Sequence, residues 1–380
     1  MFNKNNLKEI SPCFVLEETL LRKNLELMQY VQQQAGVDII LAFKGFSMWS
    51  AFPMVRKYLK GATASSLNEA RLCYEEMQTG AHTYMAAYIP HEFEELMKYS
   101  SHLSFNSIQQ FVTYREKVKK YSSKISCAIR VNPECAVVDT DLYNPAVAGS
   151  RLGETIDNFK GELPEGLEGL HFHALCESSS HDLEKVLEVF EEKFGHWLPQ
   201  LQWVNMGGGH LMTRAGYDVE HLIQVLKKFR AKHDVKIILE PGSAVAWQTG
   251  NLYATVLDIV ENKKIKTAIC DISFTAHMPD CLEMPYRPKI TGASDPIAGK
   301  PSYRIGGMSC LSGDYMDEYS FETELKIGDQ LIFEDMMHYT MVKTTTFNGV
   351  GHPCIAIERE GGAIEVIKKF VYEDFKNRLS

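Results

Sequence analysis

Apolar residues along the chain follow two spacings, which predict two kinds of regular structure. Short unbroken apolar runs closed by a turn residue predict buried strands, as in residues 39–44, where a lysine ends the run and a glycine follows it. Longer segments with apolar residues three or four positions apart predict helices with one buried face. Residues 17–34 place Leu21 and Leu25 at this spacing, and Gly36 ends the pattern.

Strand and helix patterns alternate as far as about residue 240. Helical patterns over residues 48–59, 92–99, 181–194 and 219–232 separate candidate strands. Eight strand–helix units in succession predict a (β/α)₈ barrel, which we expect to span residues 20–245. In such a barrel, catalytic residues lie at the C-terminal ends of the strands. The eight candidate strands are residues 39–44, 63–66, 83–87, 103–106, 126–131, 169–174, 203–206 and 236–240, and the residues at or just beyond their ends include Lys44, Ser65, Arg130, His173, Gly207 and Glu240.

After Trp247 the pattern changes to strands separated by turns, with few helical segments. The candidate strands here are residues 252–260, 266–271, 330–334 and 355–359. This pattern predicts a second, mostly β domain over residues 246–380. A further short strand, residues 12–16, precedes the barrel pattern, so we expect segment 1–19 to join the β domain.

The composition is that of an ordinary globular protein and argues against several classes of function. Of the 380 residues, 45% are apolar and 23% are charged, and the net charge of −9 provides no basic surface for nucleic acid. The chain has no uninterrupted apolar run of membrane-spanning length, and residues 1–10 lack the apolar core of a signal sequence. Nine cysteines without a CxxC pair argue against a disulfide framework or a structural zinc site. We therefore expect a cytoplasmic protein that binds neither nucleic acid nor membranes.

Lys44 ends the first strand of the barrel pattern and is the first candidate catalytic residue. Removing an ammonium group from water is costly unless a partner or a function compensates for it. Burial lowers the pKa of an amine, and a neutral amine can condense with a carbonyl group. The alternative is a lysine at a strand edge with its head group in water, which is the commoner situation for lysines in general.

A triple-glycine sequence and a Glu-Pro-Gly-Ser sequence follow the last two strands of the barrel pattern. Consecutive glycines let backbone N–H groups approach an anion closely, and phosphate is the usual ligand, although a plain turn has the same composition. Amides after the next strand could bind the same phosphate, and a carboxylate at the buried end of that strand needs a charged or hydrogen-bonding partner. The residues concerned are Gly207, Gly208, Gly209, Glu240, Gly242 and Ser243.

His171 and His173 lie on one face of a predicted strand. Two histidines at this spacing can ligate a metal ion, but the sequence supplies no third ligand at a conventional spacing. Two further interpretations stay open, namely a buried structural histidine and a ring that stacks on a flat ligand.

These motifs, taken with several others in the same order, resemble those of the fold-type III pyridoxal-phosphate decarboxylases. That family includes the diaminopimelate, ornithine, arginine and carboxynorspermidine decarboxylases, and the resemblance covers nearly the whole chain. In the barrel it rests on Pro12 and Val15, Lys44, Arg-Val-Asn-Pro at 130–133, Ser-Arg-Leu-Gly at 150–153, His173, the glycines at 207–209 and Glu-Pro-Gly at 240–242. In the β domain it rests on Cys-Leu-Ser-Gly-Asp at 310–314, Tyr339 with Thr340, and Thr-Phe-Asn-Gly at 346–349.

The resemblance implies that the cofactor is pyridoxal 5'-phosphate. Lys44 would hold it as a Schiff base. Glu240 would keep the pyridine nitrogen protonated, which favours decarboxylation over racemisation. His173 would stack on the ring, and Arg130 would buttress its polar edge. The phosphate would be held by Gly207, Gly208, Gly209, Gly242, Ser243 and Tyr339.

Cys310 is similar to the cysteine that returns a proton to the reacting carbon in this family. In the family this cysteine comes from the neighbouring subunit, which implies a homodimer with shared active sites. The alternative is a small buried apolar residue, the usual role of a cysteine. Thr63 stands where ornithine decarboxylases have an aspartate, so hydrogen bonding near the cofactor should differ from theirs.

Departures from the diaminopimelate decarboxylases indicate the substrate class. Those enzymes carry a glutamate where this chain has Leu311, and an arginine for the distal carboxylate where it has Glu283. A negative charge there implies a distal amine, and the nearby segments resemble those of carboxynorspermidine and carboxyspermidine decarboxylases. The implied reaction is decarboxylation of a carboxylated polyamine. The alternatives are a diaminopimelate decarboxylase, a non-catalytic homologue and, for Glu283, a merely solvated charge. Candidate substrate-binding residues are His277, Asp280, Glu283 and Asp314.

Overall fold

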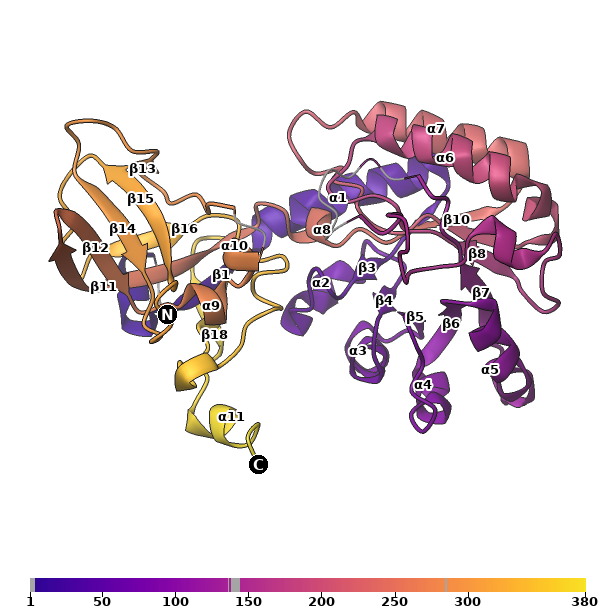
Figure 1. The fold of residues 1–380 in the computed structure, drawn as a ribbon, viewed down its shortest axis with the longest axis horizontal. Helices are drawn as coiled ribbons and strands as arrows, with labels where there is room; N and C mark the ends of the chain where they lie inside the picture. Colours follow the sequence, from indigo (N-terminus) through magenta and orange to yellow (C-terminus); the bar gives the residue numbers. More distant parts are fainter. Residues whose placement is uncertain (1–3, 136, 138–143, 284–285) are drawn as a thin grey trace. The chain divides into compact units, whose positions relative to one another are not determined.

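The computed structural model describes residues 4–135, 137, 144–283 and 286–380. The chain divides into two compact units: Lys23–Val245, and Met1–Arg22 together with Ala246–Ser380. Each unit is built around its own sheet (Figure 1). Within the described residues, no helix combines the length and the apolar character needed to cross a membrane.

The unit formed by Lys23–Val245 contains a parallel sheet that closes into a barrel. Its strand order is β2-β10-β9-β8-β7-β6-β5-β4-β3, and β2 and β3 follow each other directly in the chain. The amide of Ile40, between them, bonds to Leu239 O, and the amide of Leu41 bonds to Gly61 O, both at 2.9 Å. The predicted single strand over residues 39–44 is thus split, because the chain changes partners at Ile40. The strands are β2 (Asp38–Ile39), β3 (Leu41–Ala42), β4 (Ala62–Ala64), β5 (Ala81–Met85), β6 (Ser100–Phe105), β7 (Ser126–Arg130), β8 (Gly169–His171), β9 (Trp203–Asn205) and β10 (Lys236–Leu239).

Helices cover the outside of these strands, and the predicted (β/α)₈ barrel is confirmed (Figure 1). Helices α6 and α7 pack side by side. Ser179 and Asp182 form a capping box at the start of α6, and Asp218 caps α7. The longer helices are α1 (Glu18–Ala35), α3 (Leu67–Leu72), α4 (Phe93–Tyr99), α5 (Ile108–Lys120), α6 (Ser180–Phe194) and α7 (Val219–His233).

The predicted helix over residues 48–59 is wrong in extent. The structure has only the short helices η2 (Trp49–Ala51) and α2 (Phe52–Val55) in this segment. Beyond them, the amide of Lys60 bonds to Ile39 O at 3.0 Å instead of continuing the helix. The chain therefore leaves the helical conformation before β4 and bonds to the backbone of β2.

The unit formed by Met1–Arg22 and Ala246–Ser380 contains a mostly antiparallel sheet. Its order is β13-β15-β14-β12-β11-β1-β17-β18, with β16 paired to β11. The N-terminal strand β1 pairs with β11 and β17, so the expected pairing of this strand with the later part of the chain is confirmed. The strands are β1 (Cys13–Glu17), β11 (Gly250–Asn262), β12 (Ile265–Cys270), β13 (Ala293–Ser294), β14 (Ser302–Gly306), β15 (Tyr315–Phe321), β16 (Gln330–Phe333), β17 (Cys354–Glu358) and β18 (Ile364–Lys368).

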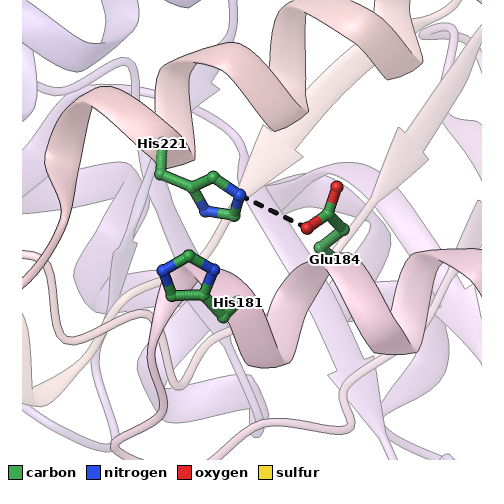
Figure 2. A group of neighbouring side chains, drawn as sticks. All are labelled: His181, Glu184 and His221. Carbon is green, nitrogen blue, oxygen red and sulfur yellow. Dashed lines mark ion pairs between the residues drawn. The ribbon is translucent and has the colours of Figure 1, made fainter.

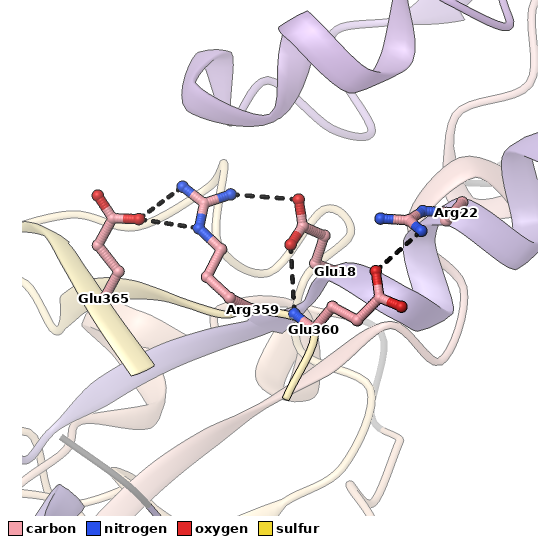
Figure 3. Close-up of polar contacts among 5 residues, drawn as sticks. All are labelled: Glu18, Arg22, Arg359, Glu360 and Glu365. Atoms are coloured by element: carbon pink, nitrogen blue, oxygen red, sulfur yellow. Dashed lines mark hydrogen bonds and ion pairs between the residues drawn. The ribbon is translucent and has the colours of Figure 1, made fainter. Parts of the chain in front are cut away.

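A network of charged side chains joins the turn between β17 and β18 to the start of α1 (Figure 3). Arg359 contacts Glu365 at 2.6 Å and Glu18 at 3.3 Å, and Arg22 contacts Glu360 at 3.1 Å. Glu18 is 19% exposed and the other four side chains are 36–69% exposed, so each pair stabilises the fold by no more than about 1 kcal/mol. We interpret this network as structural.

Candidate active site

Lys44 lies in the turn that follows β3, two residues beyond Ala42. Its neighbours Phe43 and Phe46 are fully buried, whereas the side chain of Lys44 itself keeps accessible surface. A Cβ atom on Gly45 would lie 2.6 Å from the Cα of Gly242, so this turn packs directly against the segment that follows β10. Only glycine allows that approach.

The surroundings of Lys44 lower the pKa of its amine. Burial among the barrel residues is the main cause, and the positive charge of Arg130 acts in the same direction, while Glu240 opposes them. A lowered pKa increases the share of neutral amine, which is the form that reacts with a carbonyl group. The amine of Lys44 is thus both accessible to a ligand and of lowered pKa.

Glu240 lies at the end of β10 and is only 7% exposed. Its carboxylate accepts a hydrogen bond from the Asn205 side-chain amide at 2.6 Å and lies 3.7 Å from the Nε2 atom of His171. Burial raises the pKa of Glu240, and hydrogen bonds from Asn205 and Thr63 together with the charge of Lys44 act against that rise. The buried carboxylate therefore has the partners that its position requires.

The triple-glycine turn has no room for side chains. Added Cβ atoms on Gly207, Gly208 and Gly209 would lie 2.5, 2.5 and 2.2 Å from the backbone oxygens of Phe172, Glu240 and Leu175. Gly207 and Gly209 also adopt φ angles of +68° and +89°, which favour glycine. The turn thus packs closely against the chain segments that follow β8 and β10.

Two of the three glycine amides are already bonded within the protein. The Gly207 amide donates to Asn205 Oδ1 and the Gly208 amide donates to His173 Nδ1, both at 2.8 Å. These bonds were not predicted from the sequence, which suggested all three amides as anion donors. The contacts instead fix the turn and the ring of His173.

His173 follows β8 and is held as a neutral ring. Its Nδ1 accepts the Gly208 amide, and burial holds its pKa well below the usual range, with the charges of Lys44 and Arg130 acting in the same direction. The pKa of the neighbouring His171 is also well below its usual range because of burial. Among the described residues, neither histidine belongs to a cluster with metal-ligand geometry.

Arg130, at the end of β7, is only 4% exposed. Its guanidinium group donates to His173 O at 3.3 Å and lies 4.7 Å from the ring centre of Tyr84. The Tyr84 ring in turn meets His171 edge-on, with ring centres 5.4 Å apart. Tyr84 therefore belongs to the site, although nothing in its local sequence indicated this.

In the other unit, Cys310 lies on an exposed loop between β14 and β15. Its amide and its sulfur atom lie 2.9 and 3.0 Å from Asn348 Oδ1. Asp314 is buried at the end of this loop and accepts hydrogen bonds from the amides of Thr275 and Ser309, both at 3.1 Å. The carboxylate of Asp314, a candidate substrate ligand in the sequence, thus shapes the loop that carries Cys310.

Asp280 and Glu283, at the two ends of the short helix α10 (Asp280–Glu283), share one lysine. Lys343 Nζ contacts Asp280 and lies 2.8 Å from Glu283. Burial lowers the pKa of Lys343, but the two carboxylates outweigh this effect and raise it to about 12. Two carboxylates and one ammonium leave one net negative charge, and the Glu283 side chain is 54% exposed.

The remaining candidates of this unit are less accessible. His277 is fully buried, its Nδ1 accepts the Ser273 amide at 3.2 Å, and burial lowers its pKa to about 4. Tyr339 is half-buried, with a left-handed backbone at φ 49°. Neither residue shows by itself which ligand it would contact.

Comparison with known proteins identifies the family. The profile described as "Pyridoxal-dependent decarboxylase, C-terminal sheet domain" matches residues 111–337. The chain belongs to the pyridoxal-dependent decarboxylases. It is similar to carboxyaminopropylagmatine decarboxylase from Synechocystis, with 51% identity over 97% of this chain and 95% of that protein. It is also similar to carboxynorspermidine/carboxyspermidine decarboxylase from Campylobacter jejuni, with 44% identity over 97% of this chain and 98% of that protein.

A solved structure supports the same family membership. The crystal structure of carboxynorspermidine decarboxylase complexed with norspermidine from Campylobacter jejuni superposes with a TM-score of 0.90 and 43% identity, covering 97% of this chain and 99% of that one. Diaminopimelate decarboxylase from Helicobacter pylori, at 18% identity and a TM-score of 0.83, shares the fold. The family resemblance inferred from the motifs is thus confirmed, and the protein is a carboxy-lyase.

Proposed function

We propose that this decarboxylase uses pyridoxal 5'-phosphate to convert carboxynorspermidine or carboxyspermidine into norspermidine or spermidine. The observation that carries the proposal is the carboxylate of Glu240, fixed by Asn205 at 2.6 Å and coupled electrostatically to Lys44. A buried carboxylate for the ring nitrogen and an amine of lowered pKa for the aldehyde, both at the C-terminal ends of barrel strands, are what this chemistry needs. The relatives at 51% and 44% identity support a substrate of the carboxylated polyamine class.

The residues of the barrel site fit this cofactor. Lys44 offers an accessible amine of lowered pKa for the aldehyde, and Glu240 offers a carboxylate for the ring nitrogen. The ring of His173, kept neutral and fixed by Gly208, offers a flat apolar face. Backbone amides of Gly209, Gly242 and Ser243, with Tyr339, would hold the phosphate, whereas the amides of Gly207 and Gly208 hold the turn in place.

When bound, the cofactor supplies an electron sink for the electron pair released as the substrate carboxylate leaves as carbon dioxide. Glu240 strengthens that sink because its negative charge favours a protonated ring nitrogen. Asn205 and Thr63 keep the Glu240 carboxylate in place and favour its charged form. Arg130 positions the backbone at His173 through the hydrogen bond that its guanidinium group donates to His173 O at 3.3 Å.

Cys310 would return a proton to the reacting carbon through its sulfur atom. Exposed apolar side chains lie beside it. Met308 and Leu311 are its near neighbours in the sequence, at 44% and 43% exposure, and Phe347, at 46%, precedes Asn348, which bonds to Cys310. Such side chains favour burial against a partner surface. This supports a homodimer in which Cys310 of one copy serves the barrel site of the other.

The distal end of the substrate would be recognised by the acidic pair on α10. After Lys343 is counted, Asp280 and Glu283 keep one net negative charge, and Glu283 is the more exposed of the two. An ammonium group suits this charge, while the distal carboxylate of diaminopimelate would be repelled. We assign no direct substrate contact to Asp314, whose carboxylate accepts two backbone amides, or to His277, which is fully buried with its Nδ1 bonded to the Ser273 amide.

A second candidate substrate is carboxyaminopropylagmatine, the compound in the name of the 51% identical relative. Agmatine ends in a guanidinium group, which pairs well with carboxylates in a forked geometry. The same acidic pair would therefore accept it. A non-catalytic homologue is disfavoured because both Lys44 and Cys310 are present.

The test is a substrate panel on purified protein supplied with pyridoxal 5'-phosphate. Carbon dioxide release is measured from carboxynorspermidine, carboxyspermidine, carboxyaminopropylagmatine and diaminopimelate. We expect kcat/KM for at least one of the first three to exceed that for diaminopimelate by about 100-fold or more. Faster turnover of diaminopimelate, or no carbon dioxide from any of the four, would refute the proposal.

A further inference from the structure

A cluster of two histidines and a glutamate lies between α6 and α7, on the outside of the barrel unit (Figure 2). His181 and Glu184 are three residues apart on α6, and His221 faces them from α7. His221 Nε2 lies 3.3 Å from a Glu184 carboxylate oxygen, and the two imidazole rings stack with centres 4.0 Å apart. One nitrogen or oxygen atom from each side chain falls within 4.8 Å of the others.

The ring nitrogen of His221 that faces away from Glu184 has a buried hydrogen-bond partner. Its Nδ1 lies 3.1 Å from the hydroxyl of Ser180, a residue with no exposed surface. A histidine that ligates a metal commonly uses its second ring nitrogen in such a bond, which fixes the ring's direction. With Nδ1 engaged in this way, Nε2 is the atom that points toward Glu184.

A second histidine–glutamate pair on the same two helices provides a contrast. His233 of α7 contacts Glu191 of α6, and Lys232 lies 3.0 Å from the same carboxylate. A lysine therefore already supplies the cation at that pair. In the described part of the chain, no lysine or arginine forms an ion pair with Glu184, so His221 is its charged partner only when the ring is protonated.

We infer that His181, Glu184 and His221 bind a divalent transition-metal ion such as Ni²⁺ or Zn²⁺. Two imidazole nitrogens and one carboxylate oxygen form a ligand set that these ions prefer, with water completing the coordination. Metal–ligand bonds of about 2.0–2.2 Å place neighbouring ligand atoms about 3.5 Å apart in a tetrahedron. The three ligand atoms, which lie within 4.8 Å of one another, would move closer together to reach that spacing.

The bound ion would join α6 to α7. Both helices follow site segments in the chain: α6 starts seven residues after His173, and α7 starts ten residues after Gly209, the last glycine of the triple-glycine turn. The ion would take no part in the reaction. We expect it to raise the unfolding temperature of the enzyme by binding the folded chain alone.

The experiment is calorimetric titration of the cofactor-loaded enzyme with Ni²⁺, compared among wild type, His181→Ala, His221→Ala and His233→Ala. Cysteines can also bind this ion, so the informative quantity is the difference between variants. We expect one equivalent of Ni²⁺ binding to be lost in His181→Ala and in His221→Ala but retained in His233→Ala. Ser180→Ala should weaken that site by about 10-fold to 100-fold because it removes the bond to His221.

His181 is exposed, so its replacement by alanine should not disturb folding. The unfolding temperature, measured with and without Ni²⁺, provides the second readout: wild type and His233→Ala should gain stability, and His181→Ala should not. Mg²⁺, which prefers oxygen ligands, should give no gain in any of them. Equal Ni²⁺ binding by wild type and His181→Ala would overturn the inference and leave a simple ion pair between His221 and Glu184.

Discussion

Asn205 connects Glu240 to the triple-glycine turn through the two ends of one side-chain amide. Its Nδ2 donates to the Glu240 carboxylate at 2.6 Å, and its Oδ1 accepts the Gly207 amide at 2.8 Å. The carboxylate proposed to contact the cofactor ring and the turn beside the proposed phosphate site therefore share one positioning residue. Both bonds are buried, so the loss of either leaves a polar group without a partner.

Replacing Asn205 by alanine should weaken the site at both ends. Glu240 would lose a hydrogen bond that favours its charged form, so its pKa should rise further, and the Gly207 amide would lose its acceptor. We expect a loss of about 1–3 kcal/mol in the free energy of unfolding and weaker cofactor binding. Denaturant titration and titration with pyridoxal 5'-phosphate measure the two effects.

Asn158 provides the matched control. Its side-chain amide donates to Glu154 at 2.5 Å, the same pair of residue types at an exposed position. Asn158→Ala should change stability by less than about 0.5 kcal/mol and leave cofactor affinity unchanged. Equal effects of the two substitutions would show that the Asn205 bonds have no special role.

The sequence predicts the C-terminal ends of the barrel strands to within three residues, but not the contacts between the strands. Lys44 and Glu240 could be placed because an apolar run closed by one charged residue is visible within six residues. The bonds from Thr63 and Asn205 to Glu240 could not, since they join positions far apart in the chain. An asparagine two residues before the first of three glycines is a turn signal that favours a local side-chain-to-backbone bond, and it was the available clue for Asn205.

Replacing Cys310 by alanine should slow catalysis without removing the cofactor. A positioned acid that protonates the reacting carbon contributes about 10²–10⁴-fold to the rate, so kcat should fall by at least about 100-fold. The visible absorbance of the loaded enzyme should stay as in the wild type. Cys354→Ala, at a half-buried cysteine of β17, is the control and should keep the wild-type kcat. A Cys310→Ala enzyme with normal kcat would remove this residue from the mechanism.

Glu283 should determine the affinity for the distal amine of the substrate. Glu283→Gln leaves Asp280 balanced by Lys343 and removes the net negative charge of the cluster. We expect KM for carboxynorspermidine to rise by about 5-fold to 10-fold, because a partly exposed charge pair contributes on the order of 1 kcal/mol, while kcat changes little. Steady-state kinetics at two salt concentrations test this, since the wild-type advantage should shrink at high salt.

Lys343 explains why the role of the acidic pair is hard to infer from the sequence. Asp280 and Glu283 looked like two unpaired charges, but a lysine some 60 positions later contacts both. Lys343→Met is therefore the companion variant: freeing a second carboxylate should lower KM for the polyamine. A rise in KM for Lys343→Met together with no change for Glu283→Gln would contradict substrate recognition by this cluster.

Buried neutral histidines should make the protein sensitive to mild acid. Burial lowers the pKa of His102 and His277 to about 4, whereas the unfolded chain takes up these protons near pH 6.5. The stability that each contributes is present above pH 6.5 and is lost as the pH falls toward 4, on the order of 3 kcal/mol for each residue. Thermal unfolding between pH 7.5 and 4.5 measures this loss. His102→Gln should flatten the dependence, whereas His91→Gln, at an exposed histidine, should not.

The central claim is that the amine of Lys44 holds pyridoxal 5'-phosphate. Borohydride reduction of the loaded enzyme fixes the cofactor covalently to the amine that holds it, and peptide mapping by mass spectrometry then locates the modified lysine. The account predicts a pyridoxyl group on the peptide that contains Lys44, and no such modification in Lys44→Ala. A modified lysine elsewhere with Lys44 intact, or an enzyme that takes up no cofactor at all, would contradict it.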